Sequence, residues 1–288
     1  MLQEIIEVLI SGITSGSIYA MMALGMALVY GVTKVFNFAY GSFYTMGGYL
    51  AYVVYSSGLG HLGVFLITLP VLFAAGWWTE KLAIKPLRKR DDWEMLAVMV
   101  TLGLALFLDN LHQVIFGPFK KSIPALVEGQ THVGTFVFSN HDVTILVAAL
   151  LSMLFFVLFL NKSYIGMSVR AVAQNPIGAQ IVGVANNRIF AYTFALSAVL
   201  VGTAGVLLVP KYYVHPFGGW DILVKAWVIT AFGGMGSLKG SFYAAFILGI
   251  VEAFVGWHFG LTWTIFAWFT VLLGTLIIRP QGLFGTWG

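Results

Sequence analysis

Charge is the scarcest property of this 288-residue chain. Asp, Glu, Lys and Arg together make up 9% of the residues, whereas a soluble domain has about 25%. Residues 35–79 contain none of the four. Crossing a bilayer as a helix takes roughly 20 apolar residues, so this segment is long enough for two crossings with a turn between them. The composition therefore favours an all-α, polytopic transmembrane helical bundle over a large soluble helical core.

Cysteine is absent, which excludes a disulfide framework and a thiolate metal site. The six histidines are scattered, and no His-Glu-x-x-His motif occurs, so no metal site is predicted. The stretch Gly236-Ser-Leu-Lys-Gly-Ser241 lacks the Gly-Lys-Ser/Thr order of a phosphate loop, and no soluble strand precedes it. Nucleotide hydrolysis is therefore not expected here, and the absence of any catalytic constellation predicts that the chain is not an enzyme.

Windows that are poor in charge predict the membrane spans. They cover residues 8–33, 35–57, 62–79, 95–117, 143–161, 189–210, 240–257 and 261–278. Another apolar stretch, 226–238, is only 13 residues long, which predicts a short, broken or re-entrant helix. We expect eight or nine spans in one domain, 1–288. The first span is expected to remain in the mature protein rather than to be cleaved as a signal peptide, because the N-terminus lacks the basic region of such a peptide.

The basic residues indicate orientation in the membrane rather than affinity for nucleic acid. They cluster in 80–94 and 162–188, and basic residues near span ends face the cytoplasm. If the 226–238 stretch also crosses, eleven of the 15 Lys and Arg residues lie inside. The four outside would be Lys120, Lys121, Lys211 and Lys225. The N-terminus is then outside and the C-terminus inside.

The polar interval 162–188 contains the signals of a short cytoplasmic helix. Asn175 suits the N-cap, Pro176 the first helical position and Gly183 the position after the helix ends. A helix this short needs external support. Its apolar residues could lie on the membrane surface or fit a groove on a cytoplasmic partner, and the local pattern leaves both options open.

Several glycines have spacings that suit helix packing or a break in a helix. Gly12 and Gly16 form a small-xxx-small pair that permits close helix approach. Glycines within short apolar segments are also typical of broken helices in transporters. Two regions fit that pattern: one contains Gly233, Gly234 and Gly236, and the other, its counterpart in the first half, contains Asn37, Gly41, Gly47 and Gly48. Plain helix packing is an equally good explanation for both regions.

Two acidic residues fall inside predicted spans, where a charge costs about 2.5–3.5 kcal/mol on insertion scales. Asp109 has His112 and Gln113 at helical i+3 and i+4, which predicts a polar face turned toward protein or water. Glu252 lies well inside the 240–257 span. Each residue could be a structural hydrogen-bond anchor or a substrate contact.

The motifs together resemble the branched-chain amino acid ABC transporter permeases. The run Arg170-Ala-Val-Ala-Gln-Asn-Pro176, followed by Ala179 and Gly183-Val184, is similar to that family's coupling segment. The resemblance extends in one order along nearly the whole chain, through Gly12–Ala20 with Ala23–Gly25, Asn37–Ala39 with Gly41 and Gly47-Gly48, Lys85–Arg88, Phe232–Gly240 and Arg279–Gly285.

This resemblance implies a permease subunit of an importer in a bacterial inner (plasma) membrane. Its partners would be a second permease subunit, two cytoplasmic ATPase subunits that bind ATP and Mg²⁺, and an external solute-binding protein. The chain itself would bind no cofactor. The resemblance favours the docking helix, with coupling through Arg170, Ala173, Gln174, Asn175, Pro176, Ala179, Gly183 and Val184. The candidate translocation residues are Asn37, Gly41, Gly47, Gly48, Asp109, Gly233, Gly234, Gly236 and Glu252.

The substrate and the driving force have alternatives. Members of the family carry Leu, Ile and Val, whereas relatives carry urea, short amides or other small solutes. An ion-coupled secondary transporter or channel is a rival class, but such a carrier has no need of a cytoplasmic docking helix. The expectation from the sequence is a permease that imports branched-chain amino acids with energy from ATP hydrolysis in separate subunits.

Overall fold

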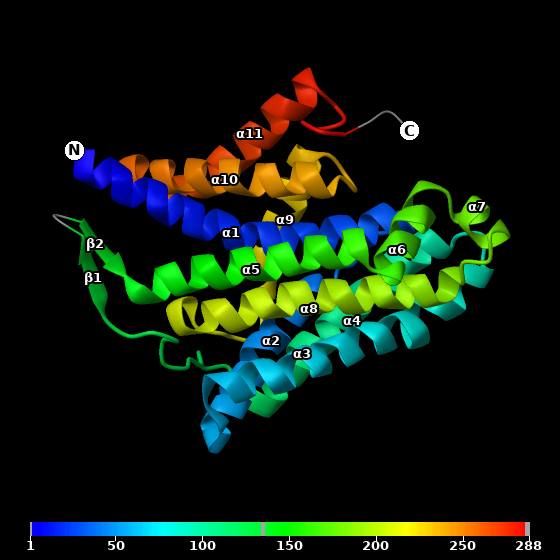
Figure 1. Ribbon diagram of the computed structural model, residues 1–288, viewed down its shortest axis with the longest axis horizontal. Helices are drawn as coiled ribbons and strands as arrows, with labels where there is room; N and C mark the ends of the chain where they lie inside the picture. Colours follow the sequence, from blue (N-terminus) through cyan, green and yellow to red (C-terminus); the bar gives the residue numbers. More distant parts are fainter. Residues whose placement is uncertain (1, 134–135, 286–288) are drawn as a thin grey trace.

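The computed structural model describes residues 2–133 and 136–285, which fold into the predicted all-α bundle (Figure 1). Its α-helices are α1 (Leu2–Thr33), α2 (Tyr40–Val54), α3 (Gly60–Trp78), α4 (Trp93–Phe116), α5 (Asn140–Lys162), α6 (Tyr164–Gln174), α7 (Pro176–Ile181), α8 (Asn186–Tyr212), α9 (Gly219–Gly233), α10 (Leu238–Phe259) and α11 (Thr264–Ile278). Short π or 3₁₀ turns cover Tyr55–Leu59, Thr79–Ile84, Lys85–Lys89 and Leu261–Trp263. A small hairpin of β1 (Gln130–Val133) and β2 (Phe136–Ser139) was not predicted.

The helices run back and forth between two ends of the bundle (Figure 1). We call these the hairpin end, which carries β1 and β2, and the α7 end. Among the described residues, seven helical stretches are long and apolar enough to cross a membrane, and one of them, Tyr40–Lys89, contains both α2 and α3. With the short helix α9, the described chain makes nine passes, so the N-terminus lies at the hairpin end and the C-terminal segment returns toward the α7 end.

The helices α2 and α9 are half-length helices that begin inside the bundle. Each has 15 residues, which spans about 22 Å at 1.5 Å per residue and falls short of a bilayer core. Their first turns touch, because a Cβ added at Gly41 would lie on the backbone of Gly219. The predicted span 35–57 was therefore wrong at its start, and the predicted 226–238 helix begins seven residues too late and ends five residues too late.

The Lys34 N–H still donates to the Tyr30 carbonyl of α1 (2.8 Å). The segment 35–39 that follows enters the bundle outside any helix, and side chains satisfy much of its backbone. The N–H of Val35 donates to Thr33 Oγ1 (3.3 Å), and that of Phe38 donates to Thr101 Oγ1 on α4 (3.2 Å). The Ala39 N–H donates to Asn37 Oδ1 (3.0 Å). Non-helical backbone at membrane depth is tolerated only where protein or water satisfies it in this way. Asn37 is thus a buried side chain that shapes the start of α2.

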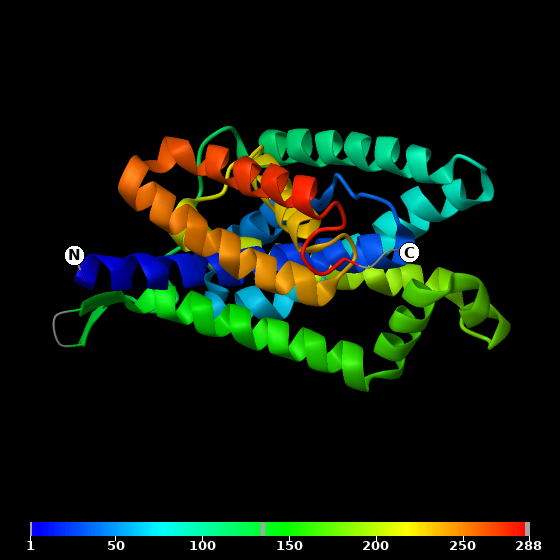
Figure 2. The same ribbon diagram turned by 90° about the horizontal axis from the view of Figure 1, so that it is seen from above.

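The centre of the bundle is α8, which is packed against α1, α2 and α3. In the most apolar 18-residue window of α8, 83% of the residues are buried, whereas only 6% are buried in the window that contains α11, at the periphery. Figure 2 shows α5 along one edge and α4 along the opposite edge, with α1 between them. Glycines permit close approach: Gly47 lies against Gly202 of α8, and Gly12 and Gly16 lie against α10, as the small-xxx-small pair predicted.

Substituting Gly47 tests this packing. A Cβ at Gly47 would meet the carbonyl oxygen and carbon of Gly202, which are backbone atoms that cannot rotate away. We expect Gly47→Ala to destabilise the chain by about 1–3 kcal/mol, the usual cost of overpacking, as a lower midpoint of thermal unfolding in detergent. Gly103→Ala on α4 is the matched control, because nothing lies within 4 Å of its added Cβ. Equal midpoints for the two variants would contradict the packing.

The glycines Gly233, Gly234 and Gly236 do not break a helix at mid-depth. Gly233 is the last residue of α9, and Gly234 and Gly236 have φ angles of 106° and 81° in the turn to α10. The turn packs on Gly31 near the end of α1 and on the C-terminal segment, whose Leu283 and Phe284 N–H groups donate to Phe232 and Gly233. The helix break that the sequence suggested for these glycines lies instead at the other end of α9.

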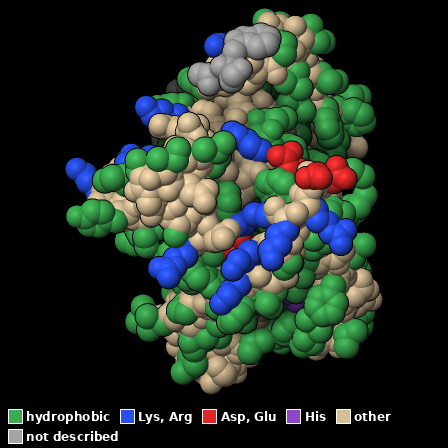
Figure 3. All heavy atoms as spheres, turned by 90° about the vertical axis from the view of Figure 1, so that its right-hand side faces the viewer, with side chains coloured by type: hydrophobic (Ala, Val, Ile, Leu, Met, Phe, Trp, Pro, Cys, Tyr) green, Lys and Arg blue, Asp and Glu red, His purple; other side chains and the backbone are tan. Residues whose placement is uncertain are grey.

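The α7 end carries most of the positive charge. The connections from α1 to α2, α3 to α4 and α5 to α8 meet there, and so do the start of α10 and the end of α11. Figure 3 shows Lys and Arg side chains gathered on this face. By the positive-inside rule, this distribution supports a cytoplasmic α7 end.

Candidate translocation and coupling sites

Asp109 joins the two half-length helices. It lies on α4 with 2% of its surface exposed. Ser42 Oγ in the first turn of α2 donates to Asp109 Oδ1 (2.7 Å), and Trp220 Nε1 in the first turn of α9 donates to Oδ2 (2.8 Å). The positive ends of two helix dipoles therefore face one carboxyl group, an arrangement that favours negative charge there. Asp109 therefore links the first turns of α2 and α9 through these two hydrogen bonds.

The polar face of α4 continues with His112 but not with Gln113. His112 is 5% exposed, and its Nδ1 lies 3.3 Å from Thr45 Oγ1 on α2. Gln113 is exposed, so the prediction that it shares this face was wrong. The buried face of α4 follows Thr101, Ala105, Asp109 and His112, and Gln113 lies beyond the edge of that stripe.

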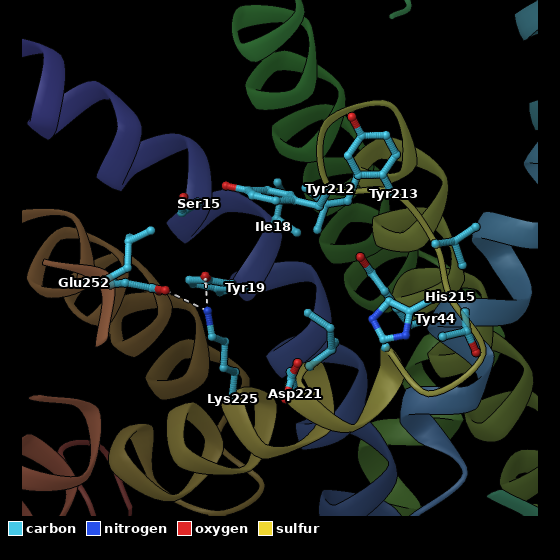
Figure 4. Close-up of a pocket in the computed structure, with 16 residues that line it drawn as sticks. Ser15, Ile18, Tyr19, Tyr44, Tyr212, Tyr213, His215, Asp221, Lys225 and Glu252 are labelled. Carbon is cyan, nitrogen blue, oxygen red and sulfur yellow. Dashed lines mark hydrogen bonds and ion pairs between the residues drawn. The ribbon is translucent and has the colours of Figure 1, made fainter. Parts of the chain in front are cut away.

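A cavity of about 290 Å³ opens beside this junction, on the hairpin side. Its lining comes from α1, α2, α8, the 213–218 segment, α9, α10 and the turn before α11. In Figure 4, Lys225 and Glu252 point toward one another on one side, while Tyr212, Tyr213 and His215 lie on another. The volume lies at the lower limit of small-molecule sites. No group of three or more His, Cys, Asp or Glu side chains that could hold a metal occurs in the described residues.

An ion pair lies in the wall of this cavity. Lys225 Nζ on α9 is 2.7 Å from Glu252 Oε1 on α10, and it also donates to Tyr19 Oη on α1 (2.6 Å). The ammonium group lies over the rings of Tyr19 and Trp268, at 4.7 and 5.3 Å from their centroids. Lys225 was predicted to lie between spans, whereas it lies inside α9, so the predicted boundary was wrong. A lone charge inside a predicted span, such as Glu252, is the signal that could have prompted a search for this partner.

Of the predicted translocation residues, Glu252 lies in the cavity wall. Gly41 and Gly48 pack against Gly219 and Val214, and Gly47 packs against Gly202. Asn37 and Asp109 organise the starts of the half-length helices. The residues that sequence reasoning missed in the cavity are Tyr19, Tyr44, Tyr212, His215, Asp221 and Lys225, which come from five separate segments and share no motif.

The candidate coupling segment forms the predicted N-cap and short helix, and the helix ends just before Gly183, as predicted. Asn175 Oδ1 accepts from the Gly178 N–H (2.8 Å), and Pro176 is the first residue of α7. Gly183 follows with a φ of 90° and donates its N–H to Gln180 (3.0 Å). Ala179 is buried, and its carbonyl accepts from the Val184 N–H (2.9 Å). These local contacts start and end α7, and the buried Ala179 packs it against the end of the bundle.

The other coupling candidates lie on α6, which precedes α7. Arg170 Nη1 donates to Asn161 Oδ1 at the end of α5 (2.8 Å). Ala173 is half-buried and Gln174 exposed, while Asn186 Nδ2 at the start of α8 donates to the Pro176 carbonyl (2.7 Å). The segment α6–α7 is therefore tied to α5 on one side and to α8 on the other.

A helical bundle with two broken passes, a charged cavity and an exposed helix at its basic end is the framework of a membrane transport protein. The family model for "Branched-chain amino acid transport system / permease component" matches residues 8–279. The chain belongs to this family and is a multi-pass permease component of a branched-chain amino acid ABC transport system.

Curated relatives match along almost their full length. The high-affinity branched-chain amino acid transport system permease protein BraD of Pseudomonas aeruginosa is 31% identical over 97% of this chain and 95% of its own. LivH of Escherichia coli is 29% identical with the same coverage. LivM of Escherichia coli is 29% identical over 92% of this chain and 67% of its own length.

Among solved structures, a chain of PsaBC from Streptococcus pneumoniae in complex with Fab aligns with 97% of this chain and 92% of its own. The TM-score is 0.46 and the identity 15%, a similarity too low to inform the fold or the function.

Proposed function

We propose that this chain is one of two permease subunits that together enclose a path for branched-chain amino acids. An external solute-binding protein delivers the substrate, and two ATPase subunits that bind ATP and Mg²⁺ at the α7 end drive transport. The permease itself binds no cofactor. The names of the relatives support the paired arrangement, because LivH and LivM of Escherichia coli are both permease proteins of a high-affinity branched-chain amino acid transport system.

The main support for docking of ATPase subunits at this end is the exposed apolar surface of α7. Ile177, Ile181 and Val182 are 72%, 80% and 78% exposed, although they lie at the basic end of the bundle, outside the predicted spans. Such side chains suit a helix that fits a groove on a partner. The buried Ala179 holds the opposite side of the helix to the bundle, so a force on the exposed side would be transmitted inward.

The path of that force runs through α8. The Asn186–Pro176 hydrogen bond ties α7 to the first turn of α8. Glycines of α8 then lie directly on α2, since a Cβ at Gly205 would meet the carbonyl of Tyr44. A shift of α8 would therefore move α2 against α9 at their junction, beside the cavity. This motion would change which end of the bundle the cavity faces.

The test is association with ATPase subunits after a charge is placed on α7. We expect Ile177→Asp/Ile181→Asp to lower copurification of two ATPase polypeptides in mild detergent by about tenfold or more, because a loss of two apolar anchors exceeds the 1.4 kcal/mol that a factor of ten requires. ATP hydrolysis stimulated by the loaded solute-binding protein should fall in parallel, while membrane insertion stays normal.

Gln180→Asp is the matched control. Gln180 is exposed on the same helix, so the substitution adds a charge without removing an apolar anchor, and association should persist. If no ATPase polypeptide accompanies the unaltered chain, the proposed association at α7 fails. If the double variant retains full coupling, α7 is not the docking helix.

A further inference from the structure

Membership of the family and the packing of the bundle do not say what the ion pair in the cavity wall binds. We propose that Lys225 and Glu252 form a binding site for the zwitterionic head group of a free α-amino acid. Lys225 takes the carboxylate and Glu252 takes the ammonium group. This inference depends on the proposed transport function and identifies the chemical class of its substrate.

The first support is the unused bonding capacity of Glu252. Its Oε1 pairs with Lys225, but its Oε2 is buried and has no hydrogen-bond partner among the described residues. A carboxylate can accept at both oxygens, and a buried acceptor without a donor is costly. Oε2 does not face the cavity as the side chain stands, but Glu252 lines the cavity, and a rotation of its carboxyl group would turn Oε2 toward an ammonium group there. Asp221, one turn before Lys225 on α9, also lines the cavity and adds a second acceptor.

The second support is electrostatic balance. The charges of Lys225 and Glu252 neutralise each other, with Nζ and Oε1 2.7 Å apart. A zwitterion inserted between them would place its carboxylate at Lys225 and its ammonium at Glu252, so one ion pair becomes two and neither charge is left alone. An amine or a carboxylic acid alone would pair with one residue and leave the other uncompensated, which is unfavourable because both side chains are partly buried (30% and 19% exposed).

The third support is the arrangement around Lys225. Tyr19 Oη accepts a hydrogen bond from Lys225 (2.6 Å), and a hydroxyl group can also donate to a carboxylate. The rest of the lining includes the apolar residues Ile18, Leu208, Ile222 and Leu261. An aliphatic side chain would be covered by them while its head group meets the ion pair. Urea and short amides carry neither charge, so the site favours amino acids over them.

The absence of cysteine from the chain permits a direct test by protection from alkylation. Ser15 lines the cavity, and Ser15→Cys introduces a unique thiol there in the assembled transporter. Labelling of this chain by a maleimide is followed by mass. The probes are L-leucine, isocaproate (which lacks the ammonium group) and isoamylamine (which lacks the carboxylate).

We expect L-leucine at about four times its Kd to slow the alkylation of Ser15→Cys about fivefold, by the factor 1 + [L]/Kd. The two analogues at the same concentration should leave the rate within about twofold, because each leaves one charge unpaired. Ser56→Cys is the control: Ser56 is exposed and lies outside the cavity lining, so its labelling should not respond to leucine.

Adding Lys225→Met or Glu252→Gln to Ser15→Cys should abolish protection by leucine. If these variants do not fold, the Ser15→Cys chain with its ion pair intact decides the question by itself. Equal protection by leucine and by either analogue, or no protection by leucine, overturns the zwitterion site. If ATPase subunits still copurify in that case, the proposed function stands without this site; if they do not, the proposed function has failed on its own test.

Discussion

Asp109→Leu is expected to destabilise the chain more than any other single substitution on α4. It leaves the half-buried Trp220 Nε1 without its acceptor, and it leaves Ser42 Oγ with only the longer hydrogen bond to the Ala105 carbonyl (3.3 Å). An unpaired donor costs about 1–3 kcal/mol, and the lost link between α2, α4 and α9 adds to it, so a loss of about 3 kcal/mol is expected. Because these donors start α2 and α9, uptake of leucine by the assembled transporter should fall with the midpoint of thermal unfolding.

One further variant separates hydrogen bonding from charge at this position. The indole of Trp220 can only donate, whereas the hydroxyl of Ser42 can donate or accept. Asn at position 109 could therefore accept from Trp220 and donate to Ser42, and Asp109→Asn should lose only about 1 kcal/mol, from the weaker interaction with the helix dipoles.

Asn110→Leu is the matched control for the Leu variant. Asn110 follows Asp109 on the same helix but is exposed, and its side chain bonds the Leu106 carbonyl of its own helix. The same loss of polarity should cost little there. If Asp109→Leu proves as stable as Asn110→Leu, Asp109 does not anchor the half-length helices.

Arg88→Met is expected to have the second large effect, at the α7 end. Arg88 pairs with Glu80, of which 1% is exposed, and its Nη1 donates to Asn187 Oδ1 (2.9 Å). The guanidinium group also lies 4.0 Å from the ring centroid of Phe190 on α8. Removing one partner of a buried pair costs about 3–5 kcal/mol, because the other charge remains buried. The midpoint of thermal unfolding should drop accordingly.

The double variant Glu80→Leu/Arg88→Met should recover most of this loss, since replacing both members of a buried pair by apolar residues is often neutral. Arg90→Met, at an exposed position two residues later, should leave the midpoint nearly unchanged. A double variant that is no more stable than Arg88→Met would show that the contacts of Arg88 with α8, and not the ion pair, dominate its contribution.

The short-range features of the chain could be predicted because their causes lie within a few residues. Asn175 and Pro176 start α7 and Gly183 follows its end through bonds between near neighbours, and the small-xxx-small pair Gly12/Gly16 depends only on helical spacing. The number of passes followed from the lengths of uncharged windows. These parts of the prediction agree with the structure.

The predicted boundaries of α9 were wrong for a specific reason. The windows treated Asp221 and Lys225 as a loop because a lone charge is unfavourable in lipid. In the structure Lys225 lies inside α9, where Glu252 of α10 and Tyr19 of α1 stabilise it. The partners are separated by 27 and 206 positions in the chain, so no local window contains both. The start of α2 was missed in the same way, since Thr101 on α4 satisfies the backbone of Phe38.

By itself, the sequence determined that this protein is a helical membrane bundle with its basic residues concentrated toward one end and a capped helix among them. Uncharged length, charge distribution and helix caps act locally, and they need no knowledge of the neighbours in space. Tertiary structure alone decided which polar groups meet: Asp109 with the first turns of α2 and α9, and Lys225 with Glu252 in the wall of a cavity. The reason is physical, because a buried charge or an open backbone group is stable only beside a partner, and in these cases the partner is on another helix.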